Sequence, residues 1–223
     1  GQTITIPVGA LSADSAPFNV RADDAYVDAN DNLSVTITGT SGANYEAVST
    51  SGTISNSVVD DADVTTLSLS ASASVSEGGT ITYTASLTNP AETAMSVTLS
   101  NGAVINIIAG ASSGNVSVAA PSDDVYIDAG SVSATIASSS GGNFESLTTN
   151  PAAAATTITD TIDTTSVTLS SATAGSNVTE GGSIVYTATV DHLVTGTPLV
   201  VTLSNGQTIT IPVGALSADS APF

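Results

Sequence analysis

TLSLSASASV (Thr66–Val75) and TITYTASLT (Thr80–Thr88), which flank the turn sequence SEGG, decide the fold class. In both runs apolar and polar residues alternate, which is the period-two pattern of a strand that buries one face. The apolar face of the second run consists of Ile81, Tyr83, Ala85 and Leu87. The glycine pair Gly78-Gly79 between the two runs is typical of a turn between strands.

Short alternating segments continue along the chain. They are predicted as strands at residues 95–99, 104–108, 115–119, 132–137 and 156–158. Asn-Gly and Asn-Pro turn signals, such as Asn101-Gly102 and Asn89-Pro90, separate them. No segment has the pattern of an amphipathic helix. About seven strands in ~100 residues predict an all-β fold of tandem immunoglobulin-like antiparallel β-sandwich domains in a linear array.

The chain repeats itself. The eighteen residues GQTITIPVGALSADSAPF occur at 1–18 and again at 206–223, and a weaker copy, GAVINIIAG, begins at Gly102. VSEGGTITYTASL from Val75 likewise matches VTEGGSIVYTATV from Val178. A period of ~100 residues is longer than that of solenoid repeats, so each unit is expected to bury its own core.

Acidic stretches indicate where one repeat ends. DDAD at 60–63 and DTID at 160–163 both precede a fresh alternating run. We therefore predict that residues 1–63 are the C-terminal part of one repeat, that 64–163 are a complete repeat, and that 164–223 are the N-terminal part of the next. On this prediction the sequence is a window of a longer array.

Composition restricts the class of partner. The chain has no cysteine or lysine, Arg21 is its only arginine, and twenty Asp and Glu residues give a formal net charge of −19. Nucleic-acid binding is not expected, because it requires many basic groups. Membrane insertion is not expected either, because no apolar run approaches ~20 residues. The regular alternation of β-branched residues is unlike a disordered chain.

Catalytic chemistry is not predicted. His192 is the only histidine, and the sequence has no Cys nucleophile, no Lys for Schiff-base chemistry and no nucleophile elbow around a serine. Paired carboxylates could serve a glycosidase, but the chain has no Trp to stack on a sugar. The sequence therefore predicts a protein that is not an enzyme.

The acidic residues are the candidate chemistry, because they gather at turns and repeat ends with almost no cationic side chains to balance them. Ca²⁺ accepts six to eight oxygens in flexible geometry and could supply that balance. The alternative is a solvated acidic surface that keeps the array soluble. The candidate calcium ligands are Asp23, Asp24, Asp28, Asp61, Asp63, Glu77, Asp123, Asp124, Asp128, Asp160, Asp163 and Glu180.

Two kinds of calcium site are expected. A junction site would combine Asp160 and Asp163 with Glu180, and its counterpart would combine Asp61 and Asp63 with Glu77. A loop site would use the acidic residues of the motif DD-x-Y-x-D, which occurs at 23–28 and at 123–128. Its ligands would be Asp123, Asp124 and Asp128 in one copy and Asp23, Asp24, Asp28 and Asp31 in the other.

A family resemblance rests on the combined string VTEGGSIVYTATV, VTLSNGQTITIPVGA, DDVYIDAG, GGNFESL and TTITDTIDTTSVTLS. It resembles the extender repeats of giant RTX biofilm adhesins of the LapA type, and its EGG turn is similar to that of Calx-beta domains. The resemblance implies type I secretion, an extracellular or bacterial cell-surface location, and Ig-like domains stiffened by Ca²⁺.

The expected function is therefore that of structural spacer repeats, which project the binding domains of a large secreted adhesin from the cell in adhesion and biofilm formation. The expected partners are neighbouring repeats of the same chain. Two alternatives stay open. In one, the chain assembles with other copies of itself into a filament, surface layer or biofilm matrix; in the other, a repeat is a carbohydrate-binding β-sandwich module.

Overall fold

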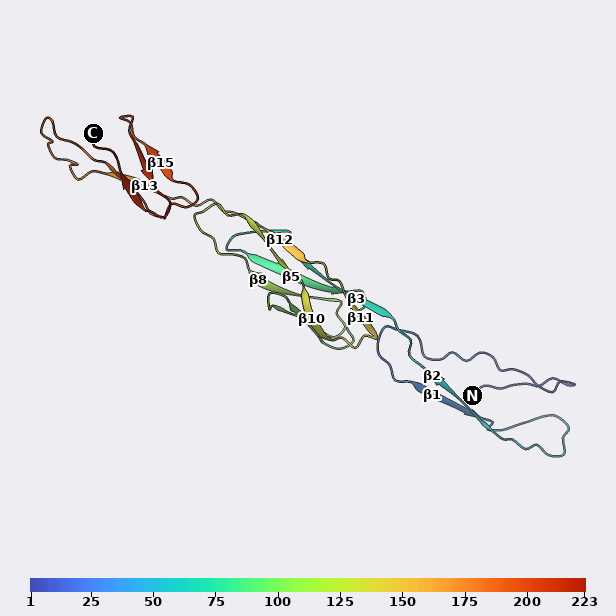
Figure 1. The fold of residues 1–223 in the computed structure, drawn as a ribbon. Helices are drawn as coiled ribbons and strands as arrows, with labels where there is room; N and C mark the ends of the chain where they lie inside the picture. The colour runs from blue at the N-terminus through green and yellow to red at the C-terminus, as the bar shows by residue number, and fades with distance from the viewer. The chain divides into compact units, whose positions relative to one another are not determined.

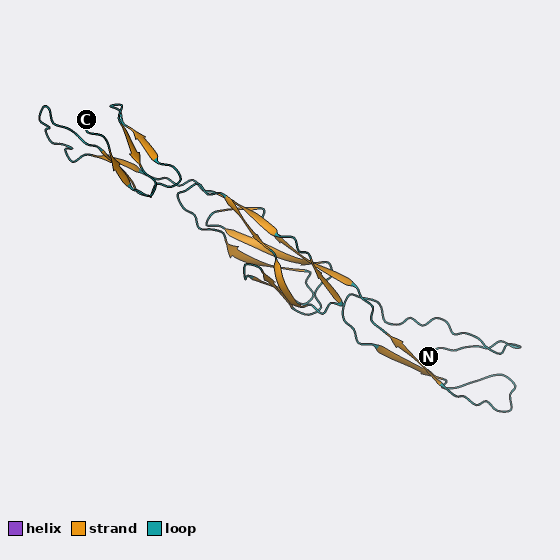
Figure 2. Cartoon of the chain, in the orientation of Figure 1, coloured by secondary structure: helices purple, strands orange, loops and turns teal.

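The computed structural model describes residues 1–223, and its regular secondary structure consists of strands alone (Figure 2). The chain folds as two compact units. The first comprises Gly1–Ser70, Thr84–Val116 and Ala134–Ala153, and the second comprises Ala71–Tyr83, Ser117–Ser133 and Ala154–Phe223. No helix is present that is long and apolar enough to cross a membrane.

The strands form six small sheets, which can be followed by their labels in Figure 1. Two sheets lie in the first unit, in the orders β1-β2 and β10-β6-β7, and three lie in the second, in the orders β4-β12-β9, β13-β14-β17 and β15-β16. The remaining sheet has the order β11-β3-β5-β8. The strands of residues 1–119 are β1 (Asp31–Thr36), β2 (Thr53–Val58), β3 (Val64–Ala71), β4 (Ser74–Ser76), β5 (Thr80–Leu87), β6 (Met95–Leu99), β7 (Val104–Ile107) and β8 (Ser113–Ala119). Those of residues 130–219 are β9 (Gly130–Ala134), β10 (Ile136–Gly141), β11 (Ser146–Thr149), β12 (Ala154–Thr159), β13 (Val167–Ser170), β14 (Thr187–Val190), β15 (Leu199–Thr202), β16 (Thr208–Ile211) and β17 (Ser217–Asp219).

The predicted alternation is confirmed in the strands of the central region. In β5 and β6 every second side chain is buried, including the predicted apolar face of β5. The two faces of each strand therefore differ in burial, as the period-two pattern requires. The buried apolar residues of 64–163 include Leu67, Ile81, Tyr83, Ala85, Leu87, Met95, Val97, Leu99, Ile105 and Ile107.

Two predicted single strands are each divided into two. The run 66–75 ends as β3 at Ala71 and resumes as β4, and the backbone and hydroxyl of Ser72 bond to Thr82 at the break, at 3.1 Å each. The run 132–137 likewise divides between β9 and β10 around Thr135, which exchanges hydrogen bonds with Ser100. Such breaks let one segment of chain contribute to two sheets.

Two strand pairs are parallel, which differs from the antiparallel pairing expected. β11 pairs with β3, and β12 pairs with β4. Gly-Gly, Asn-Gly and Asn-Pro sequences indicate tight turns between successive strands, and strands joined by tight turns are antiparallel. Parallel partners are distant in sequence, and β11 was not predicted as a strand at all.

The duplicated eighteen residues adopt two different structures. At 206–223 they form β16 and β17, and Ile209 and Ile211 are 0% exposed. At 1–18 no strand forms, and the equivalent Ile4 and Ile6 are 52% and 55% exposed. β16 is paired with β15, whereas residues 1–18 have no strand partner.

Candidate metal site

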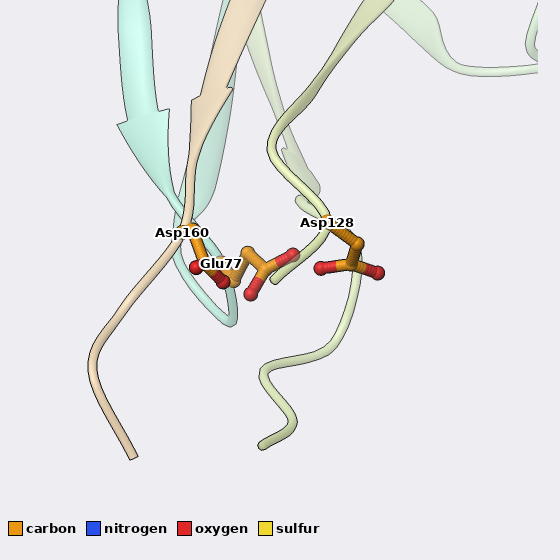
Figure 3. Close-up of side chains that lie close together, drawn as sticks. All are labelled: Glu77, Asp128 and Asp160. Carbon is orange, nitrogen blue, oxygen red and sulfur yellow. The ribbon is translucent and has the colours of Figure 1, made fainter. Parts of the chain in front are cut away.

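Three carboxylates converge in the second unit. Glu77, Asp128 and Asp160 each offer an oxygen, and these three oxygens all lie within 4.8 Å of one another. Figure 3 shows the Glu77 side chain lying between the other two, with each residue contributed by a different segment of chain. No other cluster of three or more acidic or histidine side chains in the chain has this spacing.

Parallel pairing of β4 with β12 brings Glu77 and Asp160 together. Ser76 is in register with Thr159, so the next residue of each strand is Glu77 on one and Asp160 on the other. The backbone N–H of Glu77 donates to the carbonyl of Thr159 at 3.1 Å, and this bond holds the ends of the two strands side by side. The two carboxylates are 83 residues apart in the sequence and meet only because the strands are parallel.

The turn after Glu77 requires its glycines. Gly78 has a φ of 66°, a conformation that side chains disfavour, and its N–H donates to the carbonyl of Pro121 at 2.7 Å. A Cβ on Gly79 would lie 2.6 Å from a methyl carbon of Val75. The EGG sequence is therefore a steric requirement of the turn that carries Glu77.

Asp128 comes from the loop of the motif DD-x-Y-x-D between β8 and β9. Within this loop the Asp124 carboxylate accepts a hydrogen bond from the N–H of Tyr126 at 2.7 Å, which closes a local turn. Asp123 accepts a hydrogen bond from the hydroxyl of Thr161, just beyond β12. These two contacts hold the loop that presents Asp128 to the other carboxylates.

The three carboxylates lack a counter-charge. Glu77 is only 7% exposed, and neither its Oε2 nor the Oδ1 of Asp160 has a hydrogen-bond partner. A shared hydrogen bond with Asp128, burial, and the charges of Asp128, Asp160 and Asp124 raise the pKa of Glu77 to about 7. Protonation or a bound cation is thus needed to hold these groups together.

In the first copy of the motif, the side chain of Arg21 supplies the counter-charge for the equivalent carboxylates. Asp28 and Asp60 are equivalent in the repeat to Asp128 and Asp160, and Arg21 lies 3.2 Å and 3.0 Å from them, respectively. Arg21 also lies 3.6 Å from Asp31. Pro121 stands at the position of Arg21 in the second copy, so that copy has no equivalent cation.

A second, more exposed acidic group lies in the first unit. Asp23 has its pKa raised by a hydrogen bond and charge repulsion from Asp61, with smaller effects of Asp63, burial and Asp24. Glu145 accepts a hydrogen bond from the N–H of Asp63 at 2.5 Å. That bond lowers its pKa, but burial and the charges of Asp60, Asp63 and Asp61 outweigh it and raise the pKa overall. An open cleft of about 450 Å³ lies beside this group and is lined by Asp24, Ala25, Tyr26, Asp63, Val64 and Asn89.

The structure groups the candidate ligands differently from the sequence. The sequence groups Glu77 with Asp61 and Asp63, and the carboxylates that lie beside Glu77 in the structure are those of Asp128 and Asp160. Asp163 and Glu180 are exposed and lie in no cluster of three carboxylates. The parallel pairing of β4 with β12 makes Asp160 a neighbour of Glu77, and the loop between β8 and β9 adds Asp128.

The donor set fits a hard divalent cation. Three carboxylates supply oxygen ligands only, with a buried glutamate oxygen left free to bind. Ca²⁺ is coordinated by such oxygens at 2.3–2.6 Å and completes its shell with carbonyls and water. Asp160, Glu77 and Asp128 would hold the ion, which would join two strand ends and one loop.

The fold and this site define an acidic, all-β repeat protein. The chain belongs to the LapA domain family, whose model matches residues 1–62, 63–161 and 163–221. It is thus related to the biofilm adhesins of that family, which are non-enzymatic proteins of the cell surface. No curated protein and no solved structure matches the chain.

Proposed function

We propose that these repeats are calcium-stiffened spacers of a secreted adhesin, which hold its binding domains away from the cell surface. Membership of the LapA domain family supports a role in adhesion, and the succession of ~100-residue repeats supports a role in reach rather than recognition. An eight-residue strand such as β3 spans ~26 Å, so each added sandwich lengthens the array by a few nanometres.

The observation that carries the calcium part is the buried, unpartnered oxygen of Glu77 between Asp128 and Asp160. These side chains come from the EGG turn, the DD-x-Y-x-D loop and the end of β12, where the chain leaves the central repeat. A cation bound to all three would cross-link the segments from which the next repeat departs. Bound calcium would then stiffen the end of the central repeat from which the next repeat departs.

Small-angle scattering of the full chain tests this proposal. We expect the largest dimension of the particle to be greater, and the fitted ensemble narrower, in calcium than in chelator. Glu77→Gln should abolish the difference. Glu180→Gln is the matched control, because Glu180 occupies the equivalent EGG position but is exposed and lies in no carboxylate cluster.

An identical scattering profile with and without calcium would overturn the stiffening role. A calcium response that survives in Glu77→Gln would instead move it to another site, such as the group around Asp23 and Asp61. Sedimentation of the same samples would register the alternative of self-assembly, because a filament would change mass as well as length.

A further inference from the structure

The tyrosine of the motif DD-x-Y-x-D makes the same contact in both copies. The hydroxyl of Tyr26 donates to the carbonyl of Pro90 at 2.8 Å, and that of Tyr126 donates to the carbonyl of Leu193 at 2.9 Å. The partners are 64 and 67 residues away in the sequence. In each case the tyrosine belongs to one predicted repeat and the carbonyl to the next.

Both tyrosines are positioned by the same local turn. The carboxylate of Asp24 accepts a hydrogen bond from the N–H of Tyr26 at 2.9 Å, as that of Asp124 does from Tyr126. An aspartate that caps the backbone two residues on fixes the direction of the loop. The motif thus uses its second Asp to aim its Tyr, which leaves its last Asp, Asp28 or Asp128, for the ionic cluster.

The accepting carbonyls occupy equivalent positions. Pro90 is the third residue after the end of β5, and Leu193 is the third residue after the end of β14. The side chains of Pro90 and Leu193 differ, but the hydrogen bond does not depend on them because the acceptor is a backbone carbonyl. A main-chain acceptor lets repeats of different sequence follow one another without loss of the bond.

The accepting loop is anchored to the core of its own repeat. Ala91 and Val194, which follow the two acceptors, are buried, and each exchanges hydrogen bonds with a loop further along the chain. Ala91 pairs with Gly110 at 2.7 Å and Val194 with Gly214 at 2.8 Å. Each tyrosine therefore donates its hydrogen bond to a loop that is itself anchored to the core of the next repeat.

The loop around Tyr26 makes further contacts with the following repeat. The loop around Tyr26 also pairs with Phe144: Val27 donates to Asn143 at 3.0 Å, and Glu145 donates to Ala25 at 3.2 Å. The rings of Tyr26 and Phe144 lie 6.0 Å apart between centroids. Aromatic contact of this kind adds to the hydrogen bond made by the phenol.

We infer that the tyrosine of DD-x-Y-x-D is a repeat-to-repeat clamp, which sets the angle between consecutive repeats through a bond that needs no metal. The inference deepens the proposed spacer function and rests on it for its biological meaning. The clamp and the carboxylate cluster share one loop but act separately: the tyrosine bonds the following repeat directly, and the cluster ties strand ends within its own.

Spin-label distance measurements on the full chain test the clamp. The chain has no cysteine, so labels can be placed cleanly at Ala73→Cys and Ser204→Cys, both exposed and both in the second unit. Tyr126→Phe removes only the hydroxyl. The loss of one hydrogen bond should raise the fraction outside the main distance peak about two- to tenfold.

The same increase is expected in calcium and in chelator, and Asp124→Ala should reproduce it. Tyr45→Phe is the control, because Tyr45 is 75% exposed and lies outside the motif. A distance distribution of Tyr126→Phe that superimposes on the parent would overturn the inference. The parent's distance distribution could instead be the same in calcium and in chelator while that of Tyr126→Phe is still broader. This result would contradict the calcium proposal and support the clamp.

Discussion

Glu77 makes the stability of the central repeat depend on pH and on dissolved cations. Its side chain is almost fully buried against two aspartates, and its Oε2 has no donor. A charged carboxylate in such a place is destabilising unless it is protonated or bound to a cation. The pH and the calcium concentration should therefore act on the same group.

Without metal, the chain should lose stability as the pH rises from about 4.5 to about 7. Glu77 has a pKa of about 7 when folded against 4.5 for an ordinary glutamate, so in this window the folded state holds the extra proton. A state that binds more protons is weakened when protons are withdrawn. Urea unfolding in chelator at pH 5 and pH 8 measures the effect, and in Glu77→Gln this contribution should be absent.

Calcium and the proton should compete for Glu77. Binding at pH 6 is expected to be about tenfold weaker than at pH 8, because a group with a pKa near 7 is then mostly protonated. Titrations in two buffers of different ionisation enthalpy would detect about one proton released per ion at pH 6. Affinity that does not vary between pH 6 and pH 8 would contradict a ligand role for this carboxylate.

Tyr83 gives a second test at a single residue. It is 0% exposed in β5, its hydroxyl has no partner, and burial raises its pKa. Removing an unsatisfied buried hydroxyl should stabilise the fold, so Tyr83→Phe is expected to raise the free energy of unfolding by about 1 kcal/mol. Chemical denaturation measures the change, and a loss of comparable size would show that the hydroxyl is bonded after all.

Among the elements, the EGG turn has little room for a side chain. Gly79→Ala would place a Cβ 2.6 Å from a carbon of Val75 and 2.8 Å from the carbonyl oxygen of Ser76. We expect a loss of about 1–3 kcal/mol in the free energy of unfolding, with weakened calcium binding because Glu77 shifts. Gly130→Ala is the control close to Asp128, since its nearest atom is 3.8 Å away; equal losses in both variants would contradict this account of the turn.

Strand periodicity could be predicted from the sequence because alternation is local. The faces of β5 and β6 were predicted from the pattern alone, and their burial agrees. The parallel partners of β3 and β4 could not be predicted, because they lie more than 80 residues further along the chain. The duplicated eighteen residues show the same limit, since identical letters form β16 and β17 at one place and no strand at the other.

The candidate site was half predicted for this reason. Glu77, Asp128 and Asp160 all belong to the acidic residues that the sequence singles out, since carboxylates at turns with no basic neighbours are conspicuous. The sequence groups these residues by nearness to the repeat boundary, whereas the structure brings Glu77, Asp128 and Asp160 together. The signal that could have grouped them is the position of Glu77 and Asp160 at the ends of two strands, had parallel pairing been considered.

At the scale of the whole molecule, the copies differ in how they balance the same carboxylates. Arg21 neutralises Asp28 and Asp60, whereas Pro121 stands at the equivalent position beside Asp128 and Asp160. A chain with a formal charge of −19 has one arginine for this task. On the proposed function, calcium would balance the carboxylates of the second copy as Arg21 balances those of the first.

A calorimetric calcium titration of the parent chain, Glu77→Gln and Glu180→Gln at pH 8 tests the central claim most directly. Glu77 and Glu180 share the EGG position, but only Glu77 lies in a carboxylate cluster. We expect Glu77→Gln to bind one equivalent of calcium fewer than the parent, and Glu180→Gln to bind the full number. The same stoichiometry and affinity in all three chains would contradict it.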